Sequence, residues 1–133
     1  MKRRNAKHSA RPPKVKFQEN EPLQGYYHDG KGGWYSVARL LDDTKDLPVF
    51  DLPLAAIALD HQIWQGCDML GLARHVKQCM DADLDCPILL DWMGSIADGR
   101  HRVLRAIALG KRTIKARRMT WKPDPCRQEE PRS

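Results

Sequence analysis

The residues best suited to chemistry stand together in the run from Asp98 through Gly99, Arg100 and His101 to Arg102, where a predicted strand passes into a helix. The first N–H groups of a helix have no partner within it, and the helix dipole adds partial positive charge, so such a junction favours anions. Gly99 has no Cβ to keep a ligand off the backbone, and arginines give phosphate several fixed donors. We therefore predict a phosphate site of Gly99, Arg100, His101 and Arg102, with a glycine turn before a solvated basic helix as the alternative.

Three side chains near this junction are candidates for phosphoryl chemistry. Such a reaction needs cationic stabilisation, usually from a metal ion held by carboxylates, and a group that orients or deprotonates the nucleophile. Asp98 and Asp91 supply carboxylates, and His101 can exchange a proton near neutral pH. A turn or cap role for the aspartates, and a backbone hydrogen bond for the histidine, are the structural alternatives. The catalytic candidates are Asp98, His101 and Asp91, with a nucleoside triphosphate and Mg²⁺ as candidate cofactors and the metal ligands left open.

A hairpin and a helix must position this junction. The predicted elements are strands over 87–90 and 95–97 around the turn 92–94, a helix over 103–109, and an exit strand over 113–116. Leu104 and Ile107 are expected to project into the core, and Gly110 to form a left-handed C-terminal cap. Upstream, helices are predicted over 36–41 and from Asp68 to residue 80, and a strand over 49–52. The chain therefore mixes strands and helices.

In its order and spacing this region resembles the ParB/sulfiredoxin superfamily, whose core carries a strand, a G-x-x-R box and a helix ending in Leu-Gly. The resemblance extends to the strand near 48–54 and the helix over 68–80, and covers 47–119. It implies an α+β fold, ParB/sulfiredoxin-like, with a small mixed sheet and packed helices. In ParB proteins the matching box holds the triphosphate of CTP, which implies a nucleotide at Gly99 to Arg102. Arg102 occupies the position shared by the G-x-x-R patterns and is the stronger phosphate candidate.

Departures from the family narrow the expected function. Arg100 stands where sulfiredoxin-like chains carry their catalytic cysteine, which argues against sulfinic-acid repair. No helix-turn-helix is recognisable after Met119, which argues against a complete partition protein. We expect a ParB-like phosphate- or nucleotide-binding module that acts with or on nucleic acid in a bacterium, phage or other mobile element. The alternatives are a small phosphotransferase or nucleotide hydrolase, and a metal-dependent nuclease; the sequence leaves open whether the chain is an enzyme.

The charge distribution divides the 133 residues into parts. Residues 1–22 form a basic arm expected to be disordered, 23–122 a single domain, and 123–133 a polar C-terminal tail. The net charge is +6, and the arm and residues 99–122 are both basic. Such a charge distribution is typical of chains that contact nucleic-acid phosphates. The alternative is that the basic tail is only a solvated end. The expected nucleic-acid contacts are Lys2, Arg3, Arg4, Lys7, Arg11, Lys14, Lys16, Lys111 and Arg112.

Two further patterns carry open alternatives. The stretch from Tyr26 to Tyr35 mixes aromatic residues with glycines and forms either a loop over a nucleotide or a turn whose aromatics cover the core, which we favour. In the helix over 68–80, Met69, Leu72, Ala73, Val76 and Met80 share one face, which we expect to be packed. His75 and Cys79 also lie four apart there, but a packed face is preferred to a metal site.

Composition sets the remaining expectations. The four cysteines show no C-x-x-C spacing, which favours reduced thiols in a cytoplasmic protein without zinc. No apolar run has the length of a membrane span, so no membrane partner is expected. The sequence does not define the oligomeric state.

Overall fold

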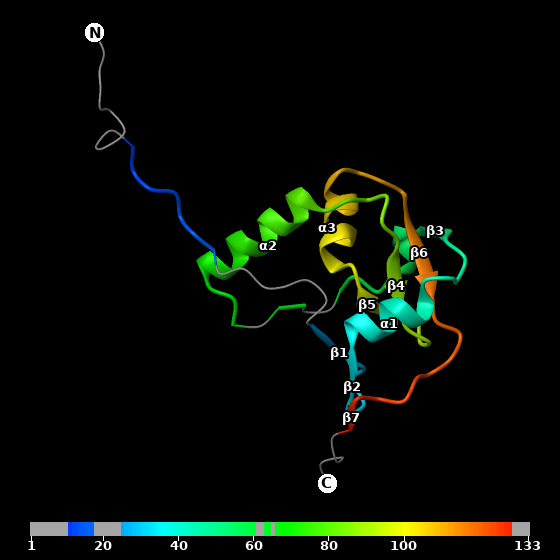
Figure 1. Cartoon of the computed structure of the whole chain (residues 1–133). Helices are drawn as coiled ribbons and strands as arrows, with labels where there is room; N and C mark the ends of the chain where they lie inside the picture. Colours follow the sequence, from blue (N-terminus) through cyan, green and yellow to red (C-terminus); the bar gives the residue numbers. More distant parts are fainter. Residues whose placement is uncertain (1–10, 18–24, 61–62, 65, 129–133) are drawn as a thin grey trace.

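The computed structural model describes residues 11–17, 25–60, 63–64 and 66–128. Within them the chain forms three α-helices and two small sheets, which confirms the predicted α+β class (Figure 1). None of the helices in this described part is long and apolar enough to cross a membrane. The elements in order are β1 (Tyr26–His28), β2 (Gly33–Ser36), α1 (Val37–Thr44), β3 (Phe50–Pro53), the 3₁₀ helix η2 (Leu54–Ala56), α2 (Met69–Asp81), β4 (Ile88–Leu90), β5 (Ile96–Asp98), α3 (Arg100–Ala108), β6 (Thr113–Arg118) and β7 (Arg127–Gln128).

The larger sheet has the strand order β3-β6-β4-β5 and is mixed. The predicted hairpin is confirmed as the antiparallel pair β4–β5, whereas β4 and β6 run parallel. Ile88 of β4 and Ile114 of β6 are buried in one core cluster with Val103 and Ala106 of α3, so one face of this helix covers the sheet. The packing of α3 on β4 and β6 fixes where its first turn lies.

The predicted C-terminal cap of α3 is also confirmed. Gly110 has φ of 74°, in the left-handed region that favours glycine. Its N–H donates to the carbonyl oxygen of Ile107 at 3.0 Å, and the N–H of Lys111 donates to that of Ala106 at 2.9 Å. These two bonds satisfy carbonyls that the helix itself leaves free, so the chain turns at Gly110 and enters β6 at once.

The smaller sheet has the order β1-β2-β7 and contains the stretch that mixes aromatic residues with glycines. Tyr27 and Tyr35 are buried in a second core cluster with Leu40, Leu89 and Met119. The interpretation that the aromatics of this stretch cover the core is therefore confirmed for Tyr27 and Tyr35, whereas Tyr26 is exposed. Figure 1 shows this sheet beside α1, at the end of the molecule away from β3.

Secondary structure continues beyond residue 122, where the polar C-terminal tail was predicted to begin. β7 pairs with β2, and the N–H of Cys126 donates to the carbonyl oxygen of Trp34 at 2.7 Å. Arg39 donates to the carbonyl oxygen of Asp124, and the guanidinium of Arg127 lies 4.8 Å from the centre of the Trp34 ring. The polar composition of this segment concealed its role, because a short edge strand needs backbone hydrogen bonds more than apolar side chains.

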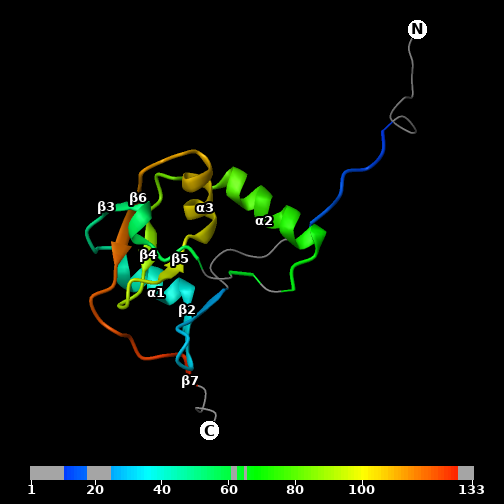
Figure 2. The same cartoon turned by 180° about the vertical axis from the view of Figure 1, so that it is seen from behind.

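Helix α2 begins where predicted but does not bury its apolar face. The Asp68 side chain caps it by accepting from the N–H of Gly71 at 2.7 Å. None of its residues is buried, however, and Met69 is 88% exposed and Val76 50% exposed. α2 packs chiefly against α3, and both views show it extending away from the two sheets (Figures 1 and 2). The helical spacing identified the apolar face correctly, but spacing does not show what covers that face.

The core side of α3 also differs from the expectation. Ile107 is 42% exposed and Leu104 is half-buried, whereas Val103 and Ala106 are the buried residues of this helix. The apolar residues of α3 cover a face wide enough for both the sheet and α2, and the sequence did not distinguish the two sides.

We predict that Ile88→Ala lowers the free energy of unfolding by about 2–5 kcal/mol, because the Ile88 side chain of β4 is fully buried in the core cluster with α3. Ile107→Ala removes the same atoms from an exposed site and is expected to cost less than about 1 kcal/mol. Urea denaturation of both variants measures the difference. Equal losses would mean that the buried side of α3 is misassigned.

Candidate functional site

A hollow of about 540 Å³ opens at the start of α3. Four of the predicted site residues line it, namely Asp98, Gly99, His101 and Arg102, together with Gln78, Ala82, Asp83 and Cys86. The N-cap residue of α3 is Gly99, which has no side chain to accept from the first N–H groups of the helix, and unpaired N–H groups of this kind are donors that an anion can use. The structure therefore brings most of the predicted phosphate site together, while Arg100 and Asp91 do not line the hollow.

Gly99 is required by packing as well as by the turn. Its φ is 108°, and a Cβ added there would lie 2.6 Å from Cγ2 of Ile88 and 3.2 Å from Nη2 of Arg102. Distances below 3.0 Å mean that any larger residue must displace the core side chain. The missing Cβ therefore serves the contact between the turn and β4, in addition to any approach of a ligand to the backbone.

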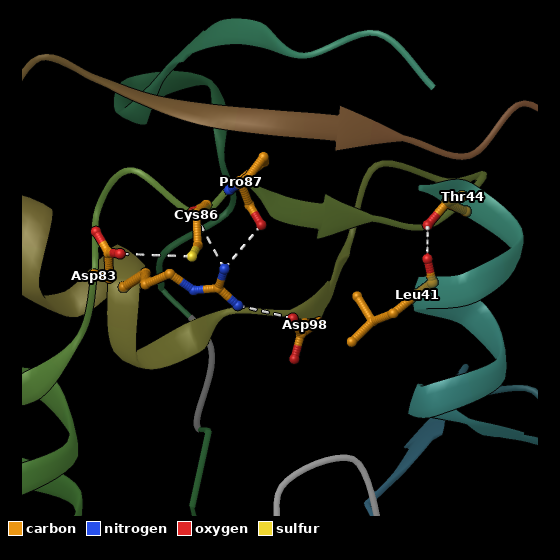
Figure 3. Close-up of polar contacts among 7 residues, drawn as sticks. Leu41, Thr44, Asp83, Cys86, Pro87 and Asp98 are labelled. Carbon is orange, nitrogen blue, oxygen red and sulfur yellow. Dashed lines mark hydrogen bonds and ion pairs between the residues drawn. The ribbon is translucent and has the colours of Figure 1, made fainter. Parts of the chain in front are cut away.

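Arg102 is held by three acceptors around the strand–helix junction. One guanidinium nitrogen, Nη1, donates to the carbonyl oxygens of Pro87 at 2.8 Å and Cys86 at 3.2 Å, and Nη2 donates to Oδ2 of Asp98 at 2.8 Å. The Arg102 and Asp98 side chains are only 18% and 27% exposed. Figure 3 shows the three acceptors Cys86, Pro87 and Asp98 gathered beside the junction. Arg102 thus ties the start of α3 to the entry of β4, and Asp98 is its ion-pair partner.

Arg100 points to a different side of α3. It lines a small cavity of about 90 Å³ with Ile96, Val103 and Ile107. Its Nε atom is buried and has no hydrogen-bond partner among the described residues. Residues two apart on a helix face in different directions, so the two arginines of the junction do not form a single cationic pair. Arg102, the stronger phosphate candidate from the sequence, is the one that pairs with an acid.

The carboxylate of Asp91 is fully buried and has a structural partner for each oxygen. Oδ2 accepts from the Tyr27 hydroxyl at 2.6 Å, while Oδ1 accepts from the N–H groups of Met93 at 2.8 Å and Ser95 at 2.9 Å. Burial, and then the hydrogen bond to Asp91, raise the pKa of Tyr27 well above its ordinary value. Asp91 closes the β4–β5 turn and joins it to the smaller sheet.

A second tyrosine–aspartate pair organises the turn before β2, and sequence analysis missed it. Oδ2 of Asp29 accepts from the Tyr35 hydroxyl at 3.0 Å, and Oδ1 accepts from the N–H groups of Lys31 at 2.7 Å and Gly33 at 3.0 Å. Burial favours a higher pKa for Asp29, but these two N–H groups and the tyrosine outweigh it and lower the pKa. Burial and the Asp29 contact raise the pKa of Tyr35 to about 12. An aspartate before Gly-Lys-Gly-Gly was the available signal for this turn.

His101 forms a histidine pair that the sequence did not predict. Its Nε2 lies 2.9 Å from Nδ1 of His75 on α2, so one ring donates and the other accepts. Trp64 stacks on His75 with ring centres 3.6 Å apart. Burial lowers the pKa of both histidines. The positive charge of Arg74 lowers the pKa of His75 further. The pKa of His101 is lowered further by the charges of its neighbours, which are His75, Arg74, Arg100 and Arg102. His75 and His101 are far apart in the sequence, so only the packing of α2 on α3 reveals the pair.

The remaining predicted residues are distributed as follows. Arg11, Lys14, Lys16, Lys111 and Arg112 are exposed. Lys2, Arg3, Arg4 and Lys7 lie outside the described residues. The four cysteines are free thiols, and no group of three or more His, Cys, Asp or Glu side chains within the described ranges is arranged to hold a metal ion.

Comparison of the chain with models of protein families, with curated proteins and with solved structures finds no match. Conclusions about function therefore depend on the geometry of the hollow and on the residues that line it.

We predict that Arg102→Ala destabilises the ligand-free protein by about 1–3 kcal/mol, because it leaves the partly buried Asp98 carboxylate and the carbonyls of residues 86 and 87 without their donor. Arg112→Ala removes an exposed arginine and is expected to change stability by less than about 0.5 kcal/mol. Chemical denaturation of both variants tests the assignment. A ligand-free Arg102→Ala protein as stable as the wild type would contradict the structural role of this residue.

The histidine pair predicts a loss of stability in mild acid. Because the pKa values of His75 and His101 are lowered from 6.5 in the folded chain, the unfolded chain binds more protons below that pH. The contribution of the neutral pair is present above pH 6.5 and is lost as the pH falls through the lowered pKa values. The melting temperature should therefore drop as the pH is lowered from about 7.5 to about 5, and less steeply in the double variant His75→Phe, His101→Phe. Parallel pH profiles would show that the pair does not cause the acid sensitivity.

Proposed function

We propose that this chain is a ParB-like module that binds the phosphate of a nucleotide or nucleic acid in the hollow at the start of α3. The observation that carries the proposal is the uncapped first turn of α3, opening into a hollow that Gly99, His101 and Arg102 line. A phosphate there receives backbone N–H donors and the positive end of the helix dipole. The predicted order of strand, Gly-x-x-Arg box, helix and Leu-Gly, found at β5, α3 and Gly110, supports the ParB-like assignment.

The two acids of the hollow set the conditions for binding. Asp98 already occupies one donor of Arg102, and Asp83 also lines the hollow, so an entering phosphate competes with fixed negative charge. Mg²⁺ is bound in proteins through one or two carboxylates together with substrate phosphates. Asp98 and Asp83 are the residues that would supply those carboxylates, and a bound Mg²⁺ would offset their repulsion of a phosphate. Phosphate binding by the hollow should consequently depend on magnesium.

Nucleic acid is the larger ligand that the charge distribution favours. The described part of the arm exposes Arg11, Lys14 and Lys16, and Lys111 and Arg112 are exposed beyond the end of α3. Cations on an exposed segment contact the phosphate backbone without sequence preference and make affinity depend on salt. The arm therefore adds affinity for a polymer, while the hollow accepts a single phosphate group.

A phosphotransferase or nucleotide hydrolase is the second candidate function. It is favoured by the presence of both Asp98 and His101 in the hollow, where a carboxylate and an imidazole could act on a bound phosphate. If the phosphate belongs to a nucleic acid, the same two residues would make a nuclease. Asp91 has no part in this version of the site, because its oxygens accept hydrogen bonds from Tyr27 and the hairpin turn.

The experiment that tests the hollow is a thermal-shift panel of nucleotides and their matched nucleosides, with and without Mg²⁺. Nucleotides should raise the melting temperature and nucleosides should not, because only the former carry phosphate. Asp98→Asn should increase the shift without Mg²⁺, since it removes a competing anion and keeps an oxygen for Arg102, and should decrease the gain that Mg²⁺ brings. No shift with any nucleotide would refute the proposal. Release of phosphate that Asp98→Asn abolishes would favour the enzyme.

We predict that deleting residues 1–18 leaves the melting temperature unchanged but weakens nucleic-acid binding, because all seven cations of the arm are removed. The slope of log K against log salt should become shallower by up to about 0.9 for each phosphate of duplex DNA that the arm neutralises in the full-length protein. Fluorescence anisotropy with a labelled duplex at several salt concentrations measures both effects. An unchanged affinity and slope would show that the arm is only a solvated end.

A further inference from the structure

The smaller sheet turns one face to the core and the other to its outer side. Successive side chains of a strand point to opposite faces of its sheet. Tyr27 and Tyr35 are buried, so their neighbours Tyr26, His28 and Trp34 lie on the outer face. The Tyr26 side chain is 62% exposed there. The strands of this sheet are separate from the described residues that line the hollow at the start of α3.

Cross-strand pairing places the side chains of the outer face beside one another. His28 is opposite Trp34, and Trp34 is opposite Arg127, so one row crosses all three strands. The ring centres of His28 and Trp34 are 4.5 Å apart, and the guanidinium carbon of Arg127 lies 4.8 Å from the centre of the Trp34 ring. In the next row Tyr26 is opposite Ser36, whose small side chain caps α1. A small residue at that position leaves space beside the aromatic rings.

A pocket of about 220 Å³, here called the sheet pocket, lies on this face. Tyr26, Trp34, Cys126 and Arg127 line it. Most ligand pockets have roughly 300–1,000 Å³, so the sheet pocket has room for one flat ring system rather than for a whole cofactor. Aromatic side chains stack on such a ring, and arginine adds a cation–π contact. The lining and the size of the pocket therefore suit a planar, unsaturated group.

The charge of the chain is concentrated outside this pocket. Among the described residues that line the sheet pocket Arg127 is the one cation, whereas residues 1–18 hold seven cations and no acid. This basic arm joins β1 through residues 19–25. A ligand that uses both parts carries uncharged flat rings along a chain of negative charges, which is the composition of nucleic acid. An uncharged aromatic compound would fit the pocket but would leave the cations of the arm unused.

We propose that the sheet pocket binds an unpaired base of single-stranded nucleic acid, while the basic arm contacts the neighbouring phosphates. This inference rests on the proposed function in taking nucleic acid as the polymer. The faces of the bases in a duplex are stacked on one another, whereas unpaired bases can stack on the aromatic side chains of a protein. Every base has such a face, so the pocket selects single strands over duplexes and has little preference for sequence.

Fluorescence anisotropy of the full-length protein tests the proposal with two labelled single strands. One is an oligothymidine of about 20 nucleotides, and the other is an abasic oligomer of the same length, which has the same phosphates without bases. The wild type should bind the oligothymidine roughly 5- to 150-fold more tightly, which is the contribution of one stacked base. Equal affinities would overturn the proposal, including the case in which another segment of the chain covers the sheet pocket.

Tyr26→Ala should remove most of this preference for bases, because it removes one wall of the sheet pocket. Its melting temperature and its slope of log K against log salt should stay those of the wild type, since the side chain is exposed and uncharged. Tyr26→Trp should keep the preference. Phe50→Ala is the matched control, because Phe50 is an aromatic residue, 40% exposed, on β3 of the larger sheet. A preference that survives Tyr26→Ala, or that Phe50→Ala lowers equally, overturns the proposal.

This result is separable from the test of the hollow at the start of α3. The thermal shift that nucleotides give and nucleosides do not give reports on phosphate binding, whereas the preference for oligothymidine over the abasic oligomer reports on the sheet pocket. A base preference that Tyr26→Ala removes, without a nucleotide shift, would refute the α3 hollow and support the sheet pocket. A nucleotide shift without a base preference would do the reverse.

Discussion

The buried carboxylate of Asp91 is the constraint on which the arrangement of the two sheets depends. A charge removed from water is costly unless hydrogen bonds replace its hydration, and Asp91 accepts one from Tyr27 and two from its own turn. Tyr27 belongs to the smaller sheet, whereas the turn belongs to the larger one. The pair therefore fixes the smaller sheet against the β4–β5 hairpin, and the hairpin in turn determines where β5 ends and α3 begins.

The strand–helix junction is held by packing and by hydrogen bonds at the place where we propose that an anion binds. Gly99 allows the turn to pass directly over Ile88, and Arg102 connects the start of α3 to residues 86 and 87. Both interactions hold the first turn of α3 in one place beside the hollow that Gly99, His101 and Arg102 line. A helix start that is already held in place would lose little entropy on binding the phosphate that we propose as its ligand.

The histidine pair connects α2 to the start of α3. His101 lines the hollow at the start of α3, and His75 lines a groove between α2 and α3. Their hydrogen bond is a direct polar link between α2 and the hollow at the start of α3. Protonation of both rings would remove it, so the position of α2 and the shape of the hollow share one titrating contact.

Local sequence patterns predicted the secondary-structure elements and their caps. The β4–β5 hairpin, the Asp68 cap, the Gly110 cap and the α+β class all follow from spacing, turn residues and capping residues, which act over a few positions. The sequence also grouped Asp98, Gly99, Arg100, His101 and Arg102 in one site, because they are neighbours in the chain, whereas in the structure Arg100 lies on another side of α3. Whether these residues bind a nucleotide stays a prediction, since neither the fold nor any related protein tests it.

The partners of these residues depend on long-range packing, which local sequence patterns do not encode. Asp91 bonds to Tyr27, and His101 to His75, across long sequence separations that no local pattern encodes. Local patterns also failed to predict the environment of α2 and the existence of β7. The helical period of α2 shows which residues share a face, but the burial of that face depends on what packs against it. The edge strand β7 forms because its backbone pairs with that of β2. Contacts between distant segments depend on how the elements pack together, which is why the sequence predicted the elements of this protein and the structure alone assigned their partners.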